Sequence, residues 1–207
     1  MKNPWEKIRL DDYENHMSLN SVKQLQTLNM MMKEQFDAYP VESAMVLGVA
    51  GGNGLEHINT DKYRIVYGVD VNENYLRTVE RRYSQFNALK CLCIDLMKDA
   101  SFLPQAQLLI ANLLIEYIGY AAFQNVVLQT RPQYVSSVIQ INTDTVNWVS
   151  DSPYIHKFDC LDEVHQQMDG EKLTVVMKEI GYSKILEKSE PLPNGKLFLR
   201  IDFQHLS

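Results

Sequence analysis

Apolar residues near the start of the chain recur at a spacing close to 3.6. Between residues 19 and 38 they form one stripe, made of Val22, Leu25, Leu28, Met32 and Phe36. A helix places residues at this spacing on one face, so the stripe predicts an amphipathic helix over 19–38. Pro40 cannot continue a helix and marks its end.

From Val41 onward, short apolar runs alternate with polar stretches of helical period. The apolar runs predict strands near residues 43–49, 63–70, 88–95, 106–118 and 133–142. The stretches between and after them predict a short helix behind the first strand and longer helices over 72–86, 121–131 and about 160–181. Strands that alternate with helices form βαβ units, which build a mostly parallel sheet covered on both faces.

The C-terminal stretch departs from this alternation. Residues 182–203 predict two strands around the turn Pro193-Asn194-Gly195, and the strands of such a hairpin are antiparallel. The sequence therefore predicts an α/β fold with a doubly wound, mostly parallel seven-stranded sheet and an antiparallel C-terminal hairpin. We expect an N-terminal helical segment over residues 1–40 and the main domain over residues 41–207.

Four glycines stand close together in "VLGVAGGNGLEHI", residues 46–58, directly after the first predicted strand. Glycine adopts positive φ at no steric cost and lets another group approach the main chain. A turn between a strand and a helix also directs backbone N–H groups at a ligand. Because ligands of doubly wound sheets lie beyond the carboxyl ends of the strands, this turn predicts a nucleotide-like site.

Acidic residues close the next two predicted strands. Asp70 ends "VYGVD", eighteen residues after Gly52, and Asp95 ends "CLCID". A carboxylate at the first of these positions can accept hydrogen bonds from ribose hydroxyls. Alternatively, both aspartates cap the helices that follow, since Asp is favoured there. Two such residues beside a glycine turn favour the ligand interpretation.

A dinucleotide-binding dehydrogenase would carry G-x-G-x-x-G at this turn. Counted from Gly52, the last glycine of that motif is replaced by His57. Close packing of helix on strand requires a small residue there, so the sequence disfavours an NAD(P)-dependent oxidoreductase, which remains one alternative.

Over about residues 41–202 the chain resembles the class I S-adenosylmethionine-dependent methyltransferases. Their first motif, hydrophobic-D-hydrophobic-G-x-G-x-G, is matched by "LGVAGGNG", with Gly48 in place of the acid and Ala50 in place of the first glycine. The resemblance implies a Rossmann-like fold, S-adenosyl-L-methionine as cofactor and a small-molecule methyl acceptor. It assigns to the cofactor Ala50, Gly51, Gly52, Asn53, Gly54, Asp70, Val71, Asp95, Leu96, Asn112 and Leu113.

Many small-molecule methyltransferases of this family fold an N-terminal segment over the cofactor. The resemblance gives this role to the segment before the first predicted helix, with Tyr13 and Met17 against the cofactor and His16 as a candidate catalytic residue. Alternatively, His16 is a surface residue. A second alternative for the whole chain is a catalytically silent module that binds S-adenosylmethionine, because Gly48 stands at the acidic position and no strong base motif is present.

Methyl transfer to a hydroxyl or an ammonium requires a base. Glu116 and Tyr117 follow the fourth predicted strand and are candidate catalytic residues. Alternatively, Glu116 is a first-turn carboxylate favoured by the helix dipole, and Tyr117 is a core aromatic. The loop after the fifth strand supplies candidate substrate contacts in Trp148, Tyr154 and His156, unless these rings merely anchor it.

The remaining polar residues are expected at the surface. His57 and His165 are placed on helix surfaces, and the arginines of the helix over 72–86 form a solvated face, made of Arg77, Arg81 and Arg82. Cys91 and Cys93 are expected on one face of a buried strand. A C-x-C metal pair is the alternative, but no nearby His or Cys completes it, so we expect no metal.

The composition of the 207-residue chain excludes some classes of binding partner. Its formal net charge of -6 argues against a general nucleic-acid binder, which must neutralise phosphates. Residues 1–20 contain no apolar core of a signal peptide, and no apolar stretch approaches the roughly 18–20 residues of a membrane span. Three cysteines provide no disulfide framework. We therefore expect a cytoplasmic monomer or homodimer without membrane contact.

Overall fold

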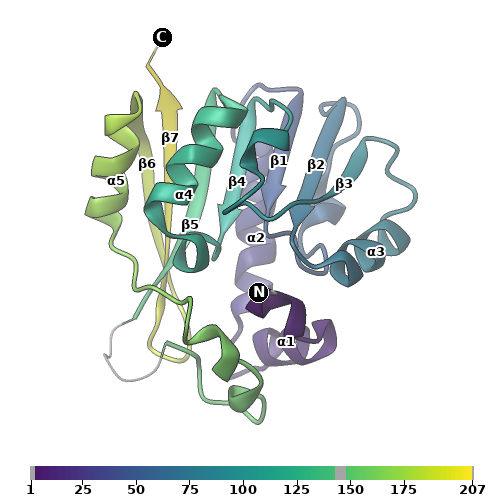
Figure 1. The fold of residues 1–207 in the computed structure, drawn as a ribbon, viewed down its shortest axis with the longest axis vertical. Helices are drawn as coiled ribbons and strands as arrows, with labels where there is room; N and C mark the ends of the chain where they lie inside the picture. The colour runs from purple at the N-terminus through teal and green to yellow at the C-terminus, as the bar shows by residue number, and fades with distance from the viewer. Residues whose placement is uncertain (1–2, 143–147, 207) are drawn as a thin grey trace.

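A seven-stranded sheet runs through the computed structural model, which describes residues 3–142 and 148–206 (Figure 1). The strand order is β3-β2-β1-β4-β5-β7-β6, and β7 is antiparallel to both of its neighbours while the other neighbouring pairs are parallel. This confirms the predicted fold class. The strands are β1 Ser43–Leu47, β2 Ile65–Asp70, β3 Leu89–Cys93, β4 Leu108–Asn112, β5 Tyr134–Ile141, β6 Tyr182–Pro191 and β7 Leu197–His205.

Helices cover both faces of the sheet. They are α1 Leu10–Ser18, α2 Gln24–Asp37, α3 Glu73–Arg82, α4 Ile115–Thr130 and α5 Gly170–Glu179. On one face, Phe36 of α2 and Val79 of α3 pack in one cluster with Val46 of the central strand. On the other, Phe123 of α4 and Met177 of α5 pack in a second cluster. None of the described helices combines the length and the hydrophobicity that a membrane span requires.

The position of each strand in the sheet explains its sequence. β1 and β4 lie in the interior and are apolar almost throughout, because both of their faces are covered. β3 lies at one edge, where Cys91 is half-buried and Cys93 is exposed. The prediction of a buried strand for these two cysteines is therefore wrong.

The N-terminal segment contains two helices where the stripe predicts one. The predicted helix over 19–38 begins only at Gln24, because the chain turns between Leu19 and Lys23. The N–H of Lys23 donates to the carbonyl of Leu19 at 2.7 Å, and Lys23 itself is left-handed with φ of 51°. α1 lies before this turn and was not predicted.

Two later helices also differ from their predicted ranges. α4 begins at Ile115, within the region assigned to the fourth strand, and is broken at Gly119, whose φ is 74°. The helix predicted over 160–181 is shorter, because α5 begins at Gly170, where the side chain of Asp169 caps Lys172 N at 2.7 Å. Residues 155–157 and 159–161 form short 3-10 turns instead.

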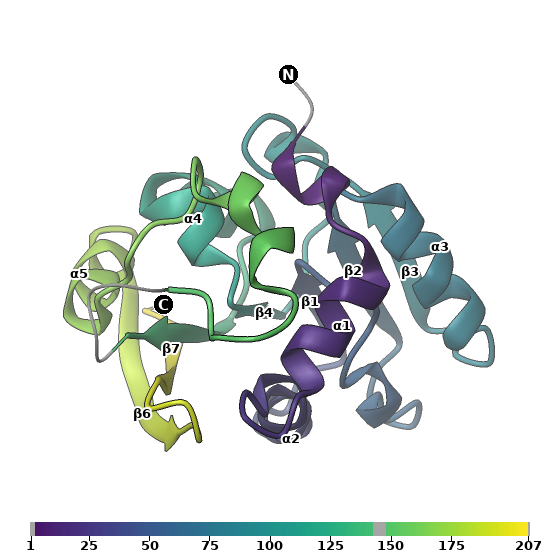
Figure 2. The same cartoon turned by 90° about the horizontal axis from the view of Figure 1, so that it is seen from below.

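Seen from below, the N-terminal segment and the segment that follows β5 lie side by side across the carboxyl ends of the parallel strands (Figure 2). Ile8 packs in one cluster with Phe158 and Leu161, far apart in sequence. These two segments thus cover the sheet edge at which the predicted ligand site lies.

Candidate active site

A cavity lies at the carboxyl ends of β1, β2 and β4, under the N-terminal segment; we call it the first cavity. Its lining residues are Asn3, Trp5, Tyr13, Gly48, Ala50, Asp70, Val71, Tyr75, Ile94, Asp95, Leu96, Met97, Asn112, Leu113, Leu114, Tyr117, Ile118 and Val164. The lining of the first cavity includes most of the residues that the resemblance assigns to the cofactor. It does not include Gly51, Gly52, Asn53, Gly54 or Met17.

Asp70 presents a buried carboxylate at the end of β2. Its Oδ2 accepts the N–H of Ala50 at 2.9 Å and its Oδ1 accepts the N–H of Asn72 at 2.8 Å. Burial raises the pKa of Asp70 to about 6, although these backbone hydrogen bonds oppose the rise. A carboxylate has about four acceptor positions. The carboxylate can therefore still accept a hydroxyl donor, as binding of a ribose requires.

Asp95 lies at the far end of the same cavity. Its Oδ1 accepts the N–H of Met97 at 3.1 Å, and its Oδ2 pairs with the ammonium of Lys98. Asp95 therefore stabilises the turn over residues 96–98 and does not cap a helix. The side chains of Ile94 and Leu96 form an apolar wall beside it, which suits a flat apolar group such as a base.

Side chains of the protein fill the space beside three of the four glycines. A Cβ on Gly52 would lie 2.5 Å from Tyr83 Cε2, and one on Gly54 would lie 2.6 Å from Met32 Cβ. A Cβ on Gly51 would meet Glu14 Oε1 at 2.1 Å. Positions 52 and 54 therefore need glycine, because the Tyr83 ring and helix α2 pack against the turn there and φ is positive at both. Gly48 differs, since it lines the first cavity.

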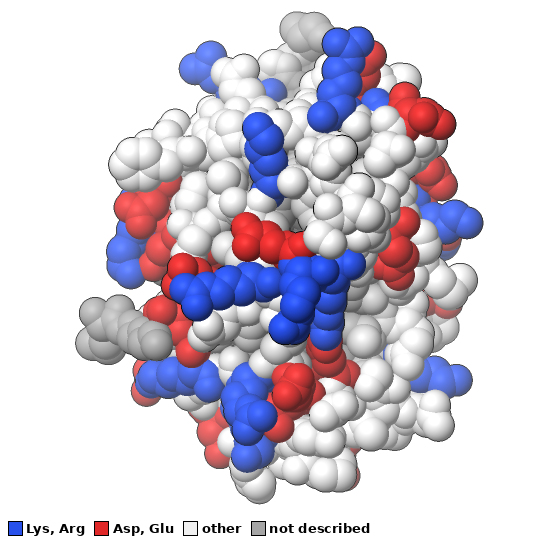
Figure 3. All heavy atoms as spheres, turned by 90° about the vertical axis from the view of Figure 1, so that its right-hand side faces the viewer, with Lys and Arg blue, Asp and Glu red and all other residues white. Residues whose placement is uncertain are grey.

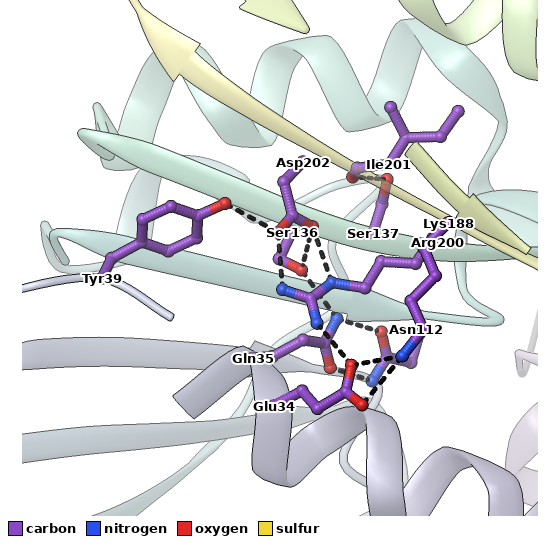
Figure 4. Close-up of polar contacts among 10 residues, drawn as sticks. All are labelled: Glu34, Gln35, Tyr39, Asn112, Ser136, Ser137, Lys188, Arg200, Ile201 and Asp202. Atoms are coloured by element: carbon purple, nitrogen blue, oxygen red, sulfur yellow. Dashed lines mark hydrogen bonds and ion pairs between the residues drawn. The ribbon is translucent and has the colours of Figure 1, made fainter. Parts of the chain in front are cut away.

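Asn112 closes β4 and is fixed by an amide pair. It donates to Gln35 Oε1 at 2.8 Å and accepts from Gln35 Nε2 at 2.9 Å. Gln35 Nε2 also donates to Ser136 Oγ at 2.9 Å, and Ser136 donates to buried Asp202. Figure 4 shows this network joining α2 to the strands behind the cavity. Sequence reasoning found Asn112 and missed its partners.

Hydrogen bonds hold the N-terminal segment over the first cavity. Arg82 Nη1 donates to the carbonyl of Gly51 at 2.9 Å, and its guanidinium also pairs with the Glu14 carboxylate. The Tyr75 hydroxyl donates to the carbonyl of Ile8 at 2.9 Å, and Asn72 Nδ2 donates to that of Trp5 at 3.1 Å. These contacts make a tether between the segment and α3.

Arg82 is therefore not part of a merely solvated face, contrary to the prediction. Its neighbour on α3 differs, because Arg77 forms an exposed pair with Glu73 at 2.9 Å. Figure 3, viewed from the α3 side, shows basic and acidic side chains intermingled over this part of the surface. The other arginine of the predicted face, Arg81, is exposed.

A second cavity adjoins the first. Its lining residues are Trp5, Tyr13, His16, Met17, Gln24, Leu113, Glu116, Tyr117, Gln140, Trp148, Val149, Ser150, Phe158 and His165. Four side chains line both cavities: Trp5, Tyr13, Leu113 and Tyr117. The two spaces thus share one wall.

The three candidate catalytic residues all line this second cavity. Glu116 is buried; its Oε1 accepts the N–H of Gln140 at 2.8 Å, and its Oε2 has no hydrogen-bond partner within the described chain. Burial raises the pKa of Glu116 to about 7. Burial, and then the charge of Glu116, raises the pKa of Tyr117.

His16 is buried, not a surface residue. Burial, followed by the nearby Lys196 ammonium, lowers the pKa of His16 to about 4. Its Nδ1 lies 2.7 Å from Ser152 Oγ. The same two causes lower the pKa of His165 to about 4. Both rings are therefore neutral near pH 7.

The three predicted substrate residues lie in different environments in the structure. Trp148 lines the second cavity and stacks on His165 with ring centroids 4.0 Å apart. His165 is therefore not on a helix surface, contrary to the prediction. Tyr154 and His156 do not line either cavity; Tyr154 packs behind Phe158, and His156 is exposed. His57 is half-buried and bonds to Asn29 Oδ1 at 2.9 Å from a 3-10 turn.

No group of three or more metal-binding side chains occurs among residues 3–142 and 148–206. No protein-family model and no curated protein matches the sequence. Solved structures of the same fold do match. The N-methyltransferase NodS from Bradyrhizobium japonicum WM9, in complex with S-adenosyl-L-homocysteine, has a TM-score of 0.67 at 12% identity, covering 94% of this chain and 96% of that chain.

Two further matching structures are named for different reactions. Magnesium protoporphyrin IX methyltransferase from Synechocystis PCC 6803 with bound S-adenosylmethionine has a TM-score of 0.60 at 8% identity, covering 89% of this chain and 79% of that chain. The [4+2]-cyclase SpnF has a TM-score of 0.66 at 8% identity, covering 89% and 82%. This chain therefore has the fold of the class I S-adenosylmethionine-dependent methyltransferases.

Proposed function

We propose that the protein is an S-adenosylmethionine-dependent methyltransferase that acts on a small-molecule acceptor. The observation that carries the proposal is the pair of adjoining cavities at the carboxyl ends of the strands, with one wall in common. A methyl group passing between two bound molecules requires such an arrangement, because both reactants must be held in contact. Segments 3–18 and 148–165 cover the site, which supports a small acceptor.

We assign the cofactor to the first cavity. Asp70 would accept the ribose hydroxyls, and the wall beside Asp95 would hold the adenine. Gly48, Asn112 and Leu113 would surround the methionine end. The cofactor supplies an activated methyl group, and the protein orients the reactants and excludes water. Two of the matching structures hold S-adenosyl compounds, and this supports the assignment.

Replacing Asp70 with asparagine tests this assignment. The change keeps the size of the side chain and removes its charge. Affinity for S-adenosylhomocysteine should fall by about 1.5–3 kcal/mol, the range for hydrogen bonds to a charged group. Isothermal calorimetry measures the change, and Asp61→Asn, on an exposed turn, is the matched control. Unchanged affinity in folded protein would remove Asp70 from the site.

The N-terminal segment is proposed to close over bound cofactor. Hydrogen exchange over residues 5–17 should slow when S-adenosylhomocysteine binds. Glu14→Gln weakens the tether to Arg82, so it should lower cofactor affinity by about threefold to tenfold, as expected for a partly exposed charged contact. The control is Glu73→Gln. Glu73 lies on α3, the helix of Arg82, but pairs with Arg77 and does not contact the N-terminal segment through this pair. Protection that rises only around Asp70 would show that the segment is not a lid.

A module that binds the cofactor without turnover is a second candidate. Gly48 favours it, because the family motif carries an acid at this position. Production of S-adenosylhomocysteine from S-adenosylmethionine, measured by mass spectrometry with a panel of amines, phenols and thiols, separates the two. Binding without turnover across the whole panel would favour the silent module. Binding of NAD in place of S-adenosylhomocysteine would favour an oxidoreductase.

A further inference from the structure

The described lining of the second cavity contains one charged side chain. Among its described lining residues Glu116 is the one carboxylate, and the lining includes no lysine or arginine. His16 and His165 are neutral near pH 7, because burial and the Lys196 ammonium lower the pKa of each. Lys196 itself is not a lining residue; its ammonium donates to Asn142 Oδ1 at 3.0 Å and to the carbonyl of Trp148. No basic lining group compensates Glu116.

Glu116 also has an unused hydrogen-bond acceptor. Its Oε2 is buried and has no hydrogen-bond partner in the described chain, whereas its Oε1 is occupied by Gln140 N. A buried polar atom without a partner is costly. A ligand with an N–H or O–H donor would satisfy it, and a cationic donor would also neutralise the carboxylate.

Other polar side chains of the lining are already engaged. Gln24 donates to Gln140 Oε1 at 2.6 Å, and Gln140 Nε2 donates to Asn142 Oδ1 and to the Trp148 carbonyl, each at 2.8 Å. His16 bonds to Ser152. Glu116 Oε2 is thus a buried carboxylate oxygen that these internal contacts leave for a ligand.

Aromatic rings form much of the remaining wall. Tyr117 contacts Trp5 edge-on with ring centroids 4.9 Å apart and Trp148 at 6.1 Å. Tyr13 and Phe158 complete this set of rings. The faces of such rings attract cations, most strongly where water is excluded. The wall and the carboxylate therefore select for the same charge.

We propose that the methyl acceptor is a small primary or secondary amine, which enters the second cavity as an ammonium and donates a hydrogen bond to Glu116 Oε2. This inference rests on the proposed function and specifies its substrate class. It gives Glu116 the role of a base that touches the substrate.

The bound ammonium gives one proton to Glu116 Oε2, which becomes a carboxylic acid, and the amine regains its lone pair. The lone pair forms a bond to the methyl carbon while the carbon–sulfur bond breaks, and its electron pair stays on sulfur. The products are S-adenosylhomocysteine and an N-methylammonium. Glu116 returns its proton to water after release. The pKa of about 7 allows the residue to hold this proton.

Three probes of equal ring size test the proposal: phenethylamine, 2-phenylethanol and phenylacetate. Each is titrated by calorimetry, near neutral pH, into protein loaded with S-adenosylhomocysteine. We expect phenethylamine to bind about tenfold or more tightly than the other two, as expected for a charge-assisted hydrogen bond. In Glu116→Gln, which keeps an acceptor for Gln140 N, this preference should disappear while S-adenosylhomocysteine affinity stays unchanged. Glu163→Gln, at an exposed acid outside the lining, is the matched control.

The outcomes separate this inference from the proposed function. Failure of S-adenosylhomocysteine to bind would overturn both. If it binds, the amine proposal alone is overturned by equal or tighter binding of the alcohol or the carboxylate, by a preference that persists in Glu116→Gln, or by no amine binding at about 10 mM. If Glu116→Gln does not fold, the relative affinities of the three probes for the natural protein still test the amine proposal.

Discussion

Replacing Asp202 with alanine is expected to lower the free energy of unfolding by about 3–5 kcal/mol, the range for breaking a buried ion pair. Asp202 on β7 is fully buried and accepts from Arg200 Nε at 3.0 Å and Nη2 at 2.6 Å. It also accepts the Tyr39 hydroxyl at 2.7 Å. Without the carboxylate, the buried guanidinium of Arg200 would keep Glu34, at 3.4 Å, as its one acidic partner among the described residues.

Urea denaturation followed by circular dichroism measures this loss. Glu187→Gln, which breaks the surface pair with Lys184, is the control and should cost about 0–1 kcal/mol. The double variant Arg200→Met with Asp202→Leu should recover most of the loss, because it leaves no charge unpaired. If Asp202→Ala loses no more unfolding free energy than Glu187→Gln, the buried pair adds little to stability.

Replacing Gly54 with alanine is expected to cost about 2–5 kcal/mol, combining left-handed strain with overpacking. The φ of Gly54 is 89°, and the new Cβ would lie 2.6 Å from Met32 Cβ. Met32 belongs to α2, which packs in the core behind the turn. The substitution therefore pushes α2 away from the turn.

Gly181→Ala is the matched control for Gly54. Its φ is 87°, and a Cβ there would have His205 Nε2 as its nearest neighbour, at 3.7 Å. That variant reports the backbone strain alone, about 1–2 kcal/mol. The difference between the two unfolding free energies, measured in urea, is the packing contribution. Equal losses would contradict the role assigned to the α2 contact.

The fold was predictable to the extent that it depends on local pattern. Alternating apolar and helical stretches placed the strands, and the Pro193-Asn194-Gly195 turn placed the antiparallel hairpin. The errors have tertiary causes. Nothing local distinguishes Lys23 as a left-handed break between helices, and the exposure of Cys93 follows from β3 being an edge strand.

The candidate site was predictable where it depends on strand ends. Asp70 and Asn112 were predicted because each closes a strand, and Glu116 because it comes soon after one; the structure places all three in the lining of the cavities. Trp5 and His165 were missed, because a short 3-10 turn, Pro4–Lys7, carries the first and an irregular segment the second, and only folding brings them to the cavities. One signal for Trp5 was available. Asn3 and Glu6 form a capping box, with the Asn3 N–H donating to Glu6 at 2.8 Å, which marks an ordered N-terminal turn.

The glycine turn shows the limit of a motif. The motif indicated a close approach to the backbone, and the structure supplies that approach with Tyr83, Met32 and Glu14. These partners lie at least 20 positions from the glycines they contact, so no local pattern identifies them. The same glycine-rich sequence is compatible with close packing against a ligand or against the protein's own side chains.

The alternation of side chains along β7 has a consequence for how the chain assembles. Ile201 and Phe203 pack in the cluster with α4 and α5, while Arg200 and Asp202 lie on the opposite face. Ser136 pairs with Asp202 in the β5–β7 ladder. Sliding β7 by one residue would exchange the two faces and move both charges into the apolar layer. A one-residue shift of β7 against β5 is therefore penalised, and the buried ion pair helps to specify the register of this strand.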